Sequence, residues 1–324
     1  MALEDNVIEE ENSCQWDGIL NKCSKGFDMS YYMDNIGILA VFYGLWISCT
    51  IVTSKLFSDQ SYRNIVTYTL ASGLRRSTPA LIHIIPYSET IYMWNTFSFV
   101  TCDFFGFWET LFAVFEMESL TMVCIERYVL AKYKTNGWEV PKGHFYLYCS
   151  LCGLFAVCYA YPPLVGVGQY AKDFDCVHCT FDMILPSAGW QRAMVVLIFF
   201  MRSIKPCIMM ILMLYWARNL EMKLKNNQAQ RMMTKGVVAA VCIHLICMLP
   251  ITAIRGGVVL SQLIYGEVLV FGQRFISLAM FFHWSSPAYT MFGLTVYDSH
   301  LRQQLINFFT NRPENDRNSD DTTN

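Results

Sequence analysis

Residues 102–130 decide the fold and read CDFFGFWETLFAVFEMESLTMVCIERYVL. The stretch is longer than the roughly 20 residues that an apolar helix needs to cross a hydrocarbon core about 30 Å thick. Four acidic residues nevertheless interrupt it before the Glu-Arg pair at its end: Asp103, Glu109, Glu116 and Glu118. An acidic side chain inside a membrane span is costly, and it marks a functional hypothesis by default. The stretch therefore predicts a membrane helix whose charges need partners or ligands.

The composition of the whole chain also favours a membrane protein. Of its 324 residues, 54% are hydrophobic and only 15% are charged, whereas soluble domains carry about 25% charged residues. Four windows without Asp, Glu, Lys or Arg are long enough to span a bilayer, at residues 35–54, 143–166, 236–254 and 275–297. Three further apolar segments carry charges, at residues 65–87, 96–128 and 193–217. The sequence predicts an all-α protein with seven membrane spans.

Basic residues indicate how the spans are oriented. They follow the first, third, fifth and seventh spans: Lys55 and Arg63; Arg127, Lys132, Lys134 and Lys142; Arg218, Lys223, Lys225, Arg231 and Lys235; Arg302. Short loops rich in Lys and Arg stay on the cytoplasmic side. The N-terminus, with its acidic stretch EDNVIEEEN, is therefore expected outside the cell and the C-terminus inside.

Four regions are expected along the chain. Residues 1–33 form an extracellular segment and residues 34–297 the seven-span domain. Residues 298–310 include LRQQLINFF, which alternates like an interfacial amphipathic helix. Residues 311–324 are polar and are predicted to form a disordered cytoplasmic tail that offers hydroxyls to kinases: Ser319, Thr322 and Thr323.

The thirteen cysteines and the lack of catalytic motifs limit the chemistry that the sequence predicts. The cysteines inside spans are expected to be buried apolar side chains, which leaves those expected outside for oxidation: Cys14, Cys23, Cys102, Cys176 and Cys179. The CVHC motif lacks a second ligand pair, so no metal site is expected. The sequence shows no phosphate loop, nucleophile elbow or His-rich metal helix, and it does not indicate an enzyme.

Several motifs together resemble the rhodopsin-like (class A) G-protein-coupled receptors, and within them the opsins. The third span matches the opsin third helix without a gap and ends in Glu126, Arg127 and Tyr128. PPLVGVGQY resembles the opsin fourth-helix exit, and the spacing from it to Cys179 is similar to that of the opsin loop that covers the retinal pocket. ICMLP resembles the sixth-helix kink, and FFHWSSPAYTMFGLTVYDSHLRQQL resembles the seventh helix and its amphipathic successor.

The resemblance implies partners, a location and a covalent link. Glu126, Arg127 and Tyr128 would couple to a heterotrimeric G protein, with Gln230 facing Arg127 from the sixth helix, and Cys102 would be bonded to Cys179. A small-molecule ligand and the lipid bilayer are further expected partners, as are arrestin and a receptor kinase at the tail, but no nucleic acid. The plasma membrane is the expected location, with a sensory cilium as one candidate.

The retinal attachment site departs from the opsin pattern. Opsins hold retinal on a seventh-helix lysine, but alternative alignments place Trp284 or Met280 there, and the usual counterion position is Phe105. No covalent cofactor is therefore expected, whereas retinal bound without a covalent link stays open. Lysine-less opsin relatives occur among invertebrates, including nematodes, and the chain resembles that group. Lys205 is the remaining candidate for a relocated Schiff base.

Two interpretations of Glu109 follow. It either packs while bonded to a polar neighbour, or it anchors a cationic or hydrogen-bonding ligand in a pocket lined by Trp108, Phe105, Met248, Trp284 and Met280. One further charge cluster is expected, because Leu74 replaces the usual second-helix Asp while Arg75 and Arg76 follow it. Either arginine could pair with Glu116, and this pairing would satisfy charges that are costly when buried alone.

Two classes of function remain from the sequence. The first is a sensory receptor that answers a chemical ligand, a retinoid or light through a G protein. The second is a retinoid or lipid binder, or an isomerase, that does not signal. The retained Glu126-Arg127-Tyr128 favours the receptor, whereas the altered seventh-helix motif favours the alternative.

Overall fold

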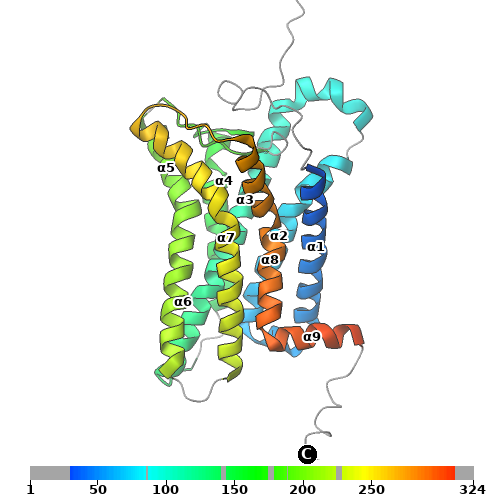
Figure 1. Cartoon of the computed structure of the whole chain (residues 1–324), viewed down its shortest axis with the longest axis vertical. Coiled ribbons are helices and arrows are strands. Elements are labelled where there is room, and N and C mark those ends of the chain that lie inside the picture. Colours follow the sequence, from blue (N-terminus) through cyan, green and yellow to red (C-terminus); the bar gives the residue numbers. More distant parts are fainter. Residues whose placement is uncertain are drawn as a thin grey trace, which may run out of the picture.

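The computed structural model describes residues 30–84, 87–139, 144–173, 179–187, 189–223 and 228–310. Most of the expected N-terminal segment and the whole expected tail lie outside these residues, as do Cys14, Cys23 and Cys176. Within them the chain is almost entirely helical, and long helices stand side by side along one axis (Figure 1).

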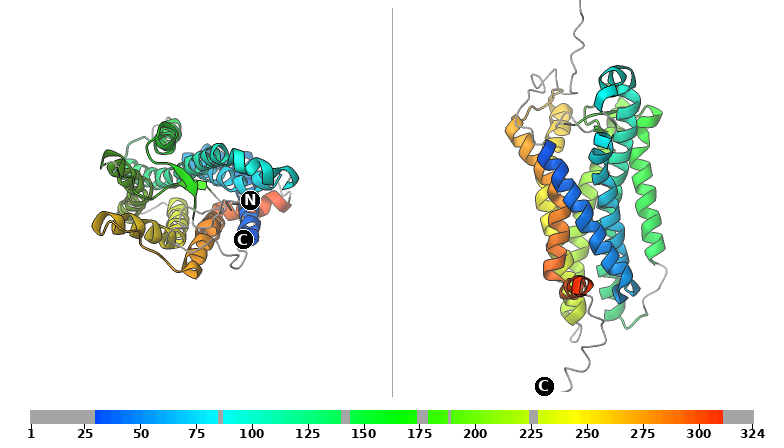
Figure 2. Two further views of the ribbon diagram at one scale, coloured as in Figure 1. Left: turned by 90° about the horizontal axis from the view of Figure 1, so that it is seen from above. Right: turned by 90° about the vertical axis from the view of Figure 1, so that its right-hand side faces the viewer.

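Seven helical rods form the bundle. They are α1 (Ser30–Thr53), α2 (Gln60–Ile84), α3 (Tyr87–Thr135), α4 (His144–Ala160), the continuous rod of α5 (Gly189–Phe199) and α6 (Lys205–Lys223), α7 (Gln228–Ile264) and α8 (Gln273–Tyr297). A π-helical segment, Phe200–Ile204, joins α5 to α6. The short helix α9 (Ser299–Thr310) lies across the end of the bundle, and two 3₁₀ turns complete the helices, at Lys55–Ser58 and Pro162–Val165 (Figures 1 and 2).

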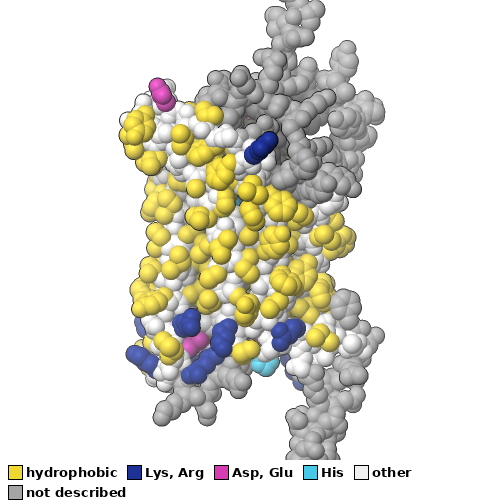
Figure 3. Space-filling view, viewed as in Figure 1, with side chains coloured by type: hydrophobic (Ala, Val, Ile, Leu, Met, Phe, Trp, Pro, Cys, Tyr) yellow, Lys and Arg dark blue, Asp and Glu magenta, His cyan; other side chains and the backbone are white. Residues whose placement is uncertain are grey.

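The outside of the bundle is apolar. On the face drawn in Figure 3, hydrophobic side chains cover the middle of the bundle, and Lys and Arg gather near the end that carries α9. Among the described residues, three helical segments are long and apolar enough to cross a membrane by these two criteria alone, namely Asn35–Thr53, Gly189–Lys223 and Gln230–Ile264. The long helix α3 is not among them because acidic residues interrupt it.

The helices extend beyond the predicted spans. The third was predicted from residue 96, but α3 begins at Tyr87, and the sixth was predicted over residues 236–254, but α7 runs from Gln228 to Ile264 through Pro250. The length of an apolar run corresponds to the part of a helix that lies in the hydrocarbon core. The helix itself can continue beyond that part, because its backbone hydrogen bonds also form in polar surroundings.

A β-hairpin covers one end of the bundle. Strand β1 (Tyr170–Lys172) pairs antiparallel with β2 (Cys179–Phe181), with Tyr170 opposite Phe181. Cys179 is bonded to Cys102 of α3, so the predicted disulfide is confirmed. Gly106 lets the hairpin approach α3, because a Cβ there would stand 2.6 Å from Cδ1 of Tyr170. The disulfide and this close contact fix the hairpin over the helices.

Asp298 fixes the opposite end. Its carboxylate accepts hydrogen bonds from the amides of His300 and Leu301 at the start of α9 and from the hydroxyl of Tyr62 at 2.9 Å. Leu301 and Leu305 of α9 are buried against the bundle. The predicted amphipathic helix thus follows the seventh rod directly.

The first prediction concerns Asp182, which follows β2 outside the membrane-spanning helices and is 3% exposed. Its carboxyl accepts hydrogen bonds from Gln169 Nε2 at 2.8 Å and from the Ile184 amide at 2.6 Å. Burial outweighs these bonds and raises the pKa of Asp182 to about 6. Compared with the unfolded chain, the folded protein therefore favours the protonated carboxyl. Its free energy of unfolding should fall as pH rises from about 4 to above 6.

Thermal unfolding measured across this range checks the prediction. Asp182→Asn keeps the shape and should flatten that part of the profile, whereas Asp103→Asn, at an exposed position, should leave it as in wild type. A wild-type stability that rises over the same interval would contradict the assignment.

Candidate functional site

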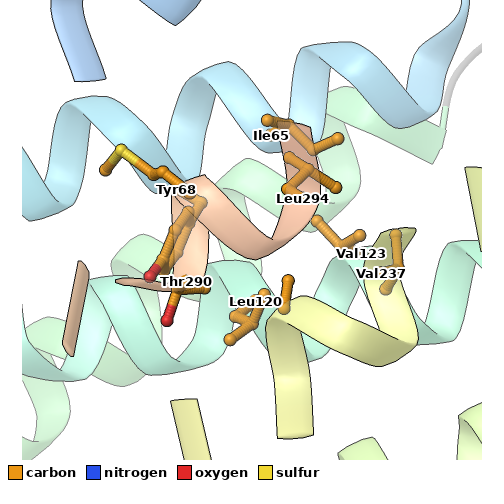
Figure 4. A pocket seen from close by; sticks show the side chains of 9 residues that line it. Ile65, Tyr68, Leu120, Val123, Val237, Thr290 and Leu294 are labelled. Atoms are coloured by element: carbon orange, nitrogen blue, oxygen red, sulfur yellow. The ribbon is translucent and has the colours of Figure 1, made fainter. Parts of the chain in front are cut away.

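A small apolar cavity lies among α2, α3, α7 and α8 (Figure 4). Tyr68 and Thr290 contribute the only hydroxyls among its lining residues. The complete lining is Ile65, Tyr68, Leu120, Val123, Val237, Ala240, Thr290, Met291 and Leu294. It contains none of the residues that the sequence suggested for a ligand, so the polar chemistry has to be sought elsewhere in the bundle.

Arg75 is the centre of a buried ionic network. Its Nε donates to Glu109 Oε1 at 2.6 Å and its Nη1 donates to Glu116 Oε2 at 2.9 Å. Its Nη2 lies 2.6 Å from Nε2 of His283. The exposed fractions of Arg75, Glu109 and Glu116 are 2%, 6% and 1%. One guanidinium therefore joins two acids of α3, about two turns apart, to α8.

Arg76 strengthens the same connection between α2 and α8. Its Nη2 donates to the carbonyl of His283 at 2.9 Å, and its guanidinium carbon lies 4.4 Å above the Trp284 ring. Leu74, at the position where the family usually has Asp, is 44% exposed and faces outward. The register of α2 thus turns both arginines into the bundle and the leucine toward the hydrocarbon.

His283 extends the network toward α7. Its Nδ1 lies 3.0 Å from Sδ of Met248. One turn further along the same helices, His244 lies 3.1 Å from Ser286 Oγ and 2.9 Å from Met117 Sδ. Sequence reasoning missed both histidines, although a histidine within an otherwise apolar span is itself a signal.

The structure distributes the predicted ligand residues over two environments. Glu109, Met248 and Trp284 belong to the network through Arg75, His283 and Arg76, and Met280 packs with Trp284 in one apolar cluster. Trp108 instead donates to the carbonyl of Leu74 at 3.2 Å and packs on Phe112, and the ring neighbour of Phe105 is Phe104. Ligand contact by these six residues stays a prediction.

A second ion pair occupies the face between α3, α4 and α6. Lys205 Nζ donates to Glu118 Oε1 at 2.5 Å and lies 4.4 Å from the centre of the Phe155 ring. Its side chain is 22% exposed. Lys205 therefore uses its amine in an ionic bond instead of presenting it to the network around Arg75.

The charged pair Glu126 and Arg127 is buried in the C-terminal part of α3. Glu126 and Arg127 are 0% and 1% exposed, and Arg127 Nη2 donates to Oγ of Ser61 on α2. Gln230, the residue expected to face Arg127, accepts instead from Lys134 at 2.8 Å. Tyr128 is half-buried and packs against Trp216. The arginine is thus held from α2.

Comparison with known proteins agrees with this architecture. Residues 44–268 match the sequence profile of the 7 transmembrane receptor (rhodopsin family). Rhodopsins of Neoniphon sammara and Sarpa salpa are 26% and 25% identical over 63% of this chain. The chain spans 60% and 59% of the lengths of these two relatives. The crystal structure of squid rhodopsin is similar with a TM-score of 0.69 at 14% sequence identity. The alignment covers 91% of this chain and 89% of the squid rhodopsin chain.

The chain belongs to the rhodopsin family of seven-transmembrane receptors, because the family profile matches more than half of it. The predicted seven-helix membrane bundle and the opsin relationship are confirmed. The family is in general a receptor family and not an enzyme family, and the comparisons give no support to an isomerase.

The second prediction tests the network around Arg75. Arg75→Gln should lower the free energy of unfolding by about 3–5 kcal/mol, because it leaves two buried carboxylates without their cation. Glu116→Gln should then cost less in the Arg75→Gln background than in wild type. Thermal unfolding of the four proteins gives the coupling energy.

Glu118→Gln is the matched control, because Glu118 lies on the same helix but pairs with Lys205. Its effect should add to that of Arg75→Gln within about 0.5 kcal/mol. Additive losses for Arg75 and Glu116 would show that their contact contributes no coupling.

Proposed function

We propose that this chain is an opsin-related sensory receptor that lacks the retinal Schiff base and signals to a heterotrimeric G protein. Its stimulus would be a chemical ligand or a retinoid bound without a covalent link. The observation that carries the proposal is the Glu126-Arg127-Tyr128 motif near the inner end of α3, with its charged pair buried, in a chain of the rhodopsin family.

The attachment chemistry supports a stimulus other than covalent retinal. The helix α8 contains no lysine in residues 273–297, and both candidate positions, Met280 and Trp284, are buried among apolar side chains. An amine is required to form a Schiff base with an aldehyde. Lys205 is not on α8: it is bonded to Glu118 and lies over the Phe155 ring, on the face between α3, α4 and α6.

The surroundings of the motif support coupling from the inner face. Arg218 and Lys223 of α6 and Lys235 of α7 are exposed near the loop between these helices. Exposed positive charges of this kind suit contact with either a G protein or anionic lipid. We place the receptor in the plasma membrane with its N-terminus outside, with a sensory cilium as one candidate. Arrestin and a receptor kinase would act on residues 311–324.

A retinoid or lipid binder without signalling is the second candidate function. The observation in its favour is the replacement of the opsin seventh-helix chemistry by an internal ionic network that involves Arg75, Arg76 and His283. Such a network stabilises one packing of α2, α3 and α8. A protein that only binds a ligand needs no second arrangement of its helices.

The third prediction separates the two functions. In cells that carry nucleotide-exchange sensors for each Gα class, Ser61→Ala should raise the basal exchange rate severalfold, because it removes the bond that holds Arg127 to α2. Arg127→Gln should abolish exchange, because the buried arginine is the group released toward the G protein.

Ser58→Ala is the control, since Ser58 is exposed at the same end of the bundle. It should leave the basal rate unchanged. Equal exchange by wild type, Ser61→Ala and Arg127→Gln, with each protein at the cell surface, would favour the non-signalling binder.

The fourth prediction concerns retinal itself. Purified protein incubated with 11-cis or all-trans retinal should give neither a borohydride-trapped adduct nor a red-shifted visible band, because α8 offers no amine. Mass spectrometry and absorption spectra measure the two outcomes. An adduct that forms in wild type and is lost in Lys205→Arg would instead show a photopigment with a relocated link.

A further inference from the structure

Four guanidinium groups are buried between the β-hairpin and the middle of the bundle. Arg75, Arg76, Arg202 and Arg255 are 2%, 2%, 6% and 7% exposed. Three of them have bonded partners. Arg75 has two acids, Arg76 has the His283 carbonyl and the Trp284 ring, and Arg255 donates to Asp173 at 2.6 Å.

Arg202 differs from the other three. Its Nη1 is buried without a hydrogen-bond partner in the part of the chain that the structure describes. Nε and Nη1 of Arg76 also lack one, but Arg76 bonds the His283 carbonyl through Nη2 and lies over the Trp284 ring. No salt bridge joins it to any described acid, whereas Asp173 is used by Arg255, and Glu109 and Glu116 are used by Arg75. A buried charge without a partner costs several kcal/mol in a folded protein. An anion bound to Arg202 would offset this cost.

The local structure places Arg202 beside the other cations. It lies in the π-helical segment Phe200–Ile204, and such segments occur frequently at functional sites. Phe199, three residues earlier, packs on Gly256, the neighbour of Arg255 in sequence, with its Cζ 3.3 Å from where a Cβ would stand. Arg202 also lies within electrostatic range of Arg255 and Arg75, and of Glu109, whose charge is paired with Arg75. An anion at Arg202 would therefore interact with several positive charges.

Apart from the phenol of Tyr170, the remaining surroundings are apolar. Beneath the hairpin, one cluster joins Phe181 and Met183 to Val195, Phe199 and Val259. A guanidinium binds a carboxylate through two parallel hydrogen bonds, and these bonds strengthen where water is excluded. A ligand that suits both features has a carboxylate head and an elongated apolar body.

We propose that Arg202, with Arg255 beside it, binds the carboxylate of such a ligand. This inference deepens the proposed receptor function and rests on it for its biological meaning. A cationic ligand suits the site less well, because it would have to displace Arg75 from Glu109. The arginine that lacks a partner leaves a positive charge for the ligand to neutralise.

Two pairs of molecules test the head group separately from the body. All-trans-retinoic acid and all-trans-retinol share one polyene, and palmitic acid and hexadecanol share one alkyl chain. In purified protein, each acid should raise the melting temperature and bind about tenfold or more tightly than its alcohol. Arg202→Gln should remove this preference and should raise the melting temperature of the ligand-free protein.

Arg218→Gln is the matched control, because Arg218 is exposed on the same helical rod and far along it from Arg202. It should keep the acid preference. The proposal is overturned if neither acid is preferred in wild type, if Arg202→Gln retains the preference, or if Arg202→Gln destabilises the ligand-free protein as Arg75→Gln is expected to do. The binding assay needs no G protein, so its failure is distinct from a failure to signal.

Discussion

The contact of Arg75 with Glu109 and Glu116 is the constraint on which the rest of the bundle depends. Removing each of these charges from water costs several kcal/mol, and only good geometry recovers that cost. Bonds of 2.6 and 2.9 Å from one planar guanidinium provide it. Because the three groups come from α2 and α3, the rotation of these helices about their axes is fixed. The outward position of Leu74 and the inward position of Arg76 then follow from the helical period.

The same network takes the place that a Schiff base and its counterion hold in opsins. There, a cation of the seventh helix meets an acid of the third. Here the cation comes from α2, and it reaches α8 through His283, while Arg76 covers Trp284. Phe105 is compatible with this change, since an acid at that position would have no lysine to pair with. The acid of the ionic contact is still on the third helix, whereas its cation comes from the second helix instead of the seventh.

Sequence reasoning reached the bundle and part of the network for identifiable reasons. Apolar length located the spans, and the family resemblance placed Glu116 opposite the second-helix position that Leu74 occupies, next to the arginines that follow it. It did not predict that one arginine takes both acids, because the choice depends on side-chain rotamers. Asp173 was also missed, because its contact with Arg255 depends on the path of the chain after β1, and short polar loop residues show no periodicity.

A ligand that brings an anion to Arg202 would act on the network without touching it. Arg202 and Arg75 repel one another within the low-dielectric interior, where charges are weakly screened. A carboxylate on Arg202 would neutralise that repulsion and change how strongly Arg75 is held by Glu109. Arg75 joins α3 to α8, and α3 contains Arg127 before it ends at Thr135, so a change in charge near the hairpin is linked to Arg127 through a single helix. A shift of this kind has effect only if the ligand favours one helix arrangement over another.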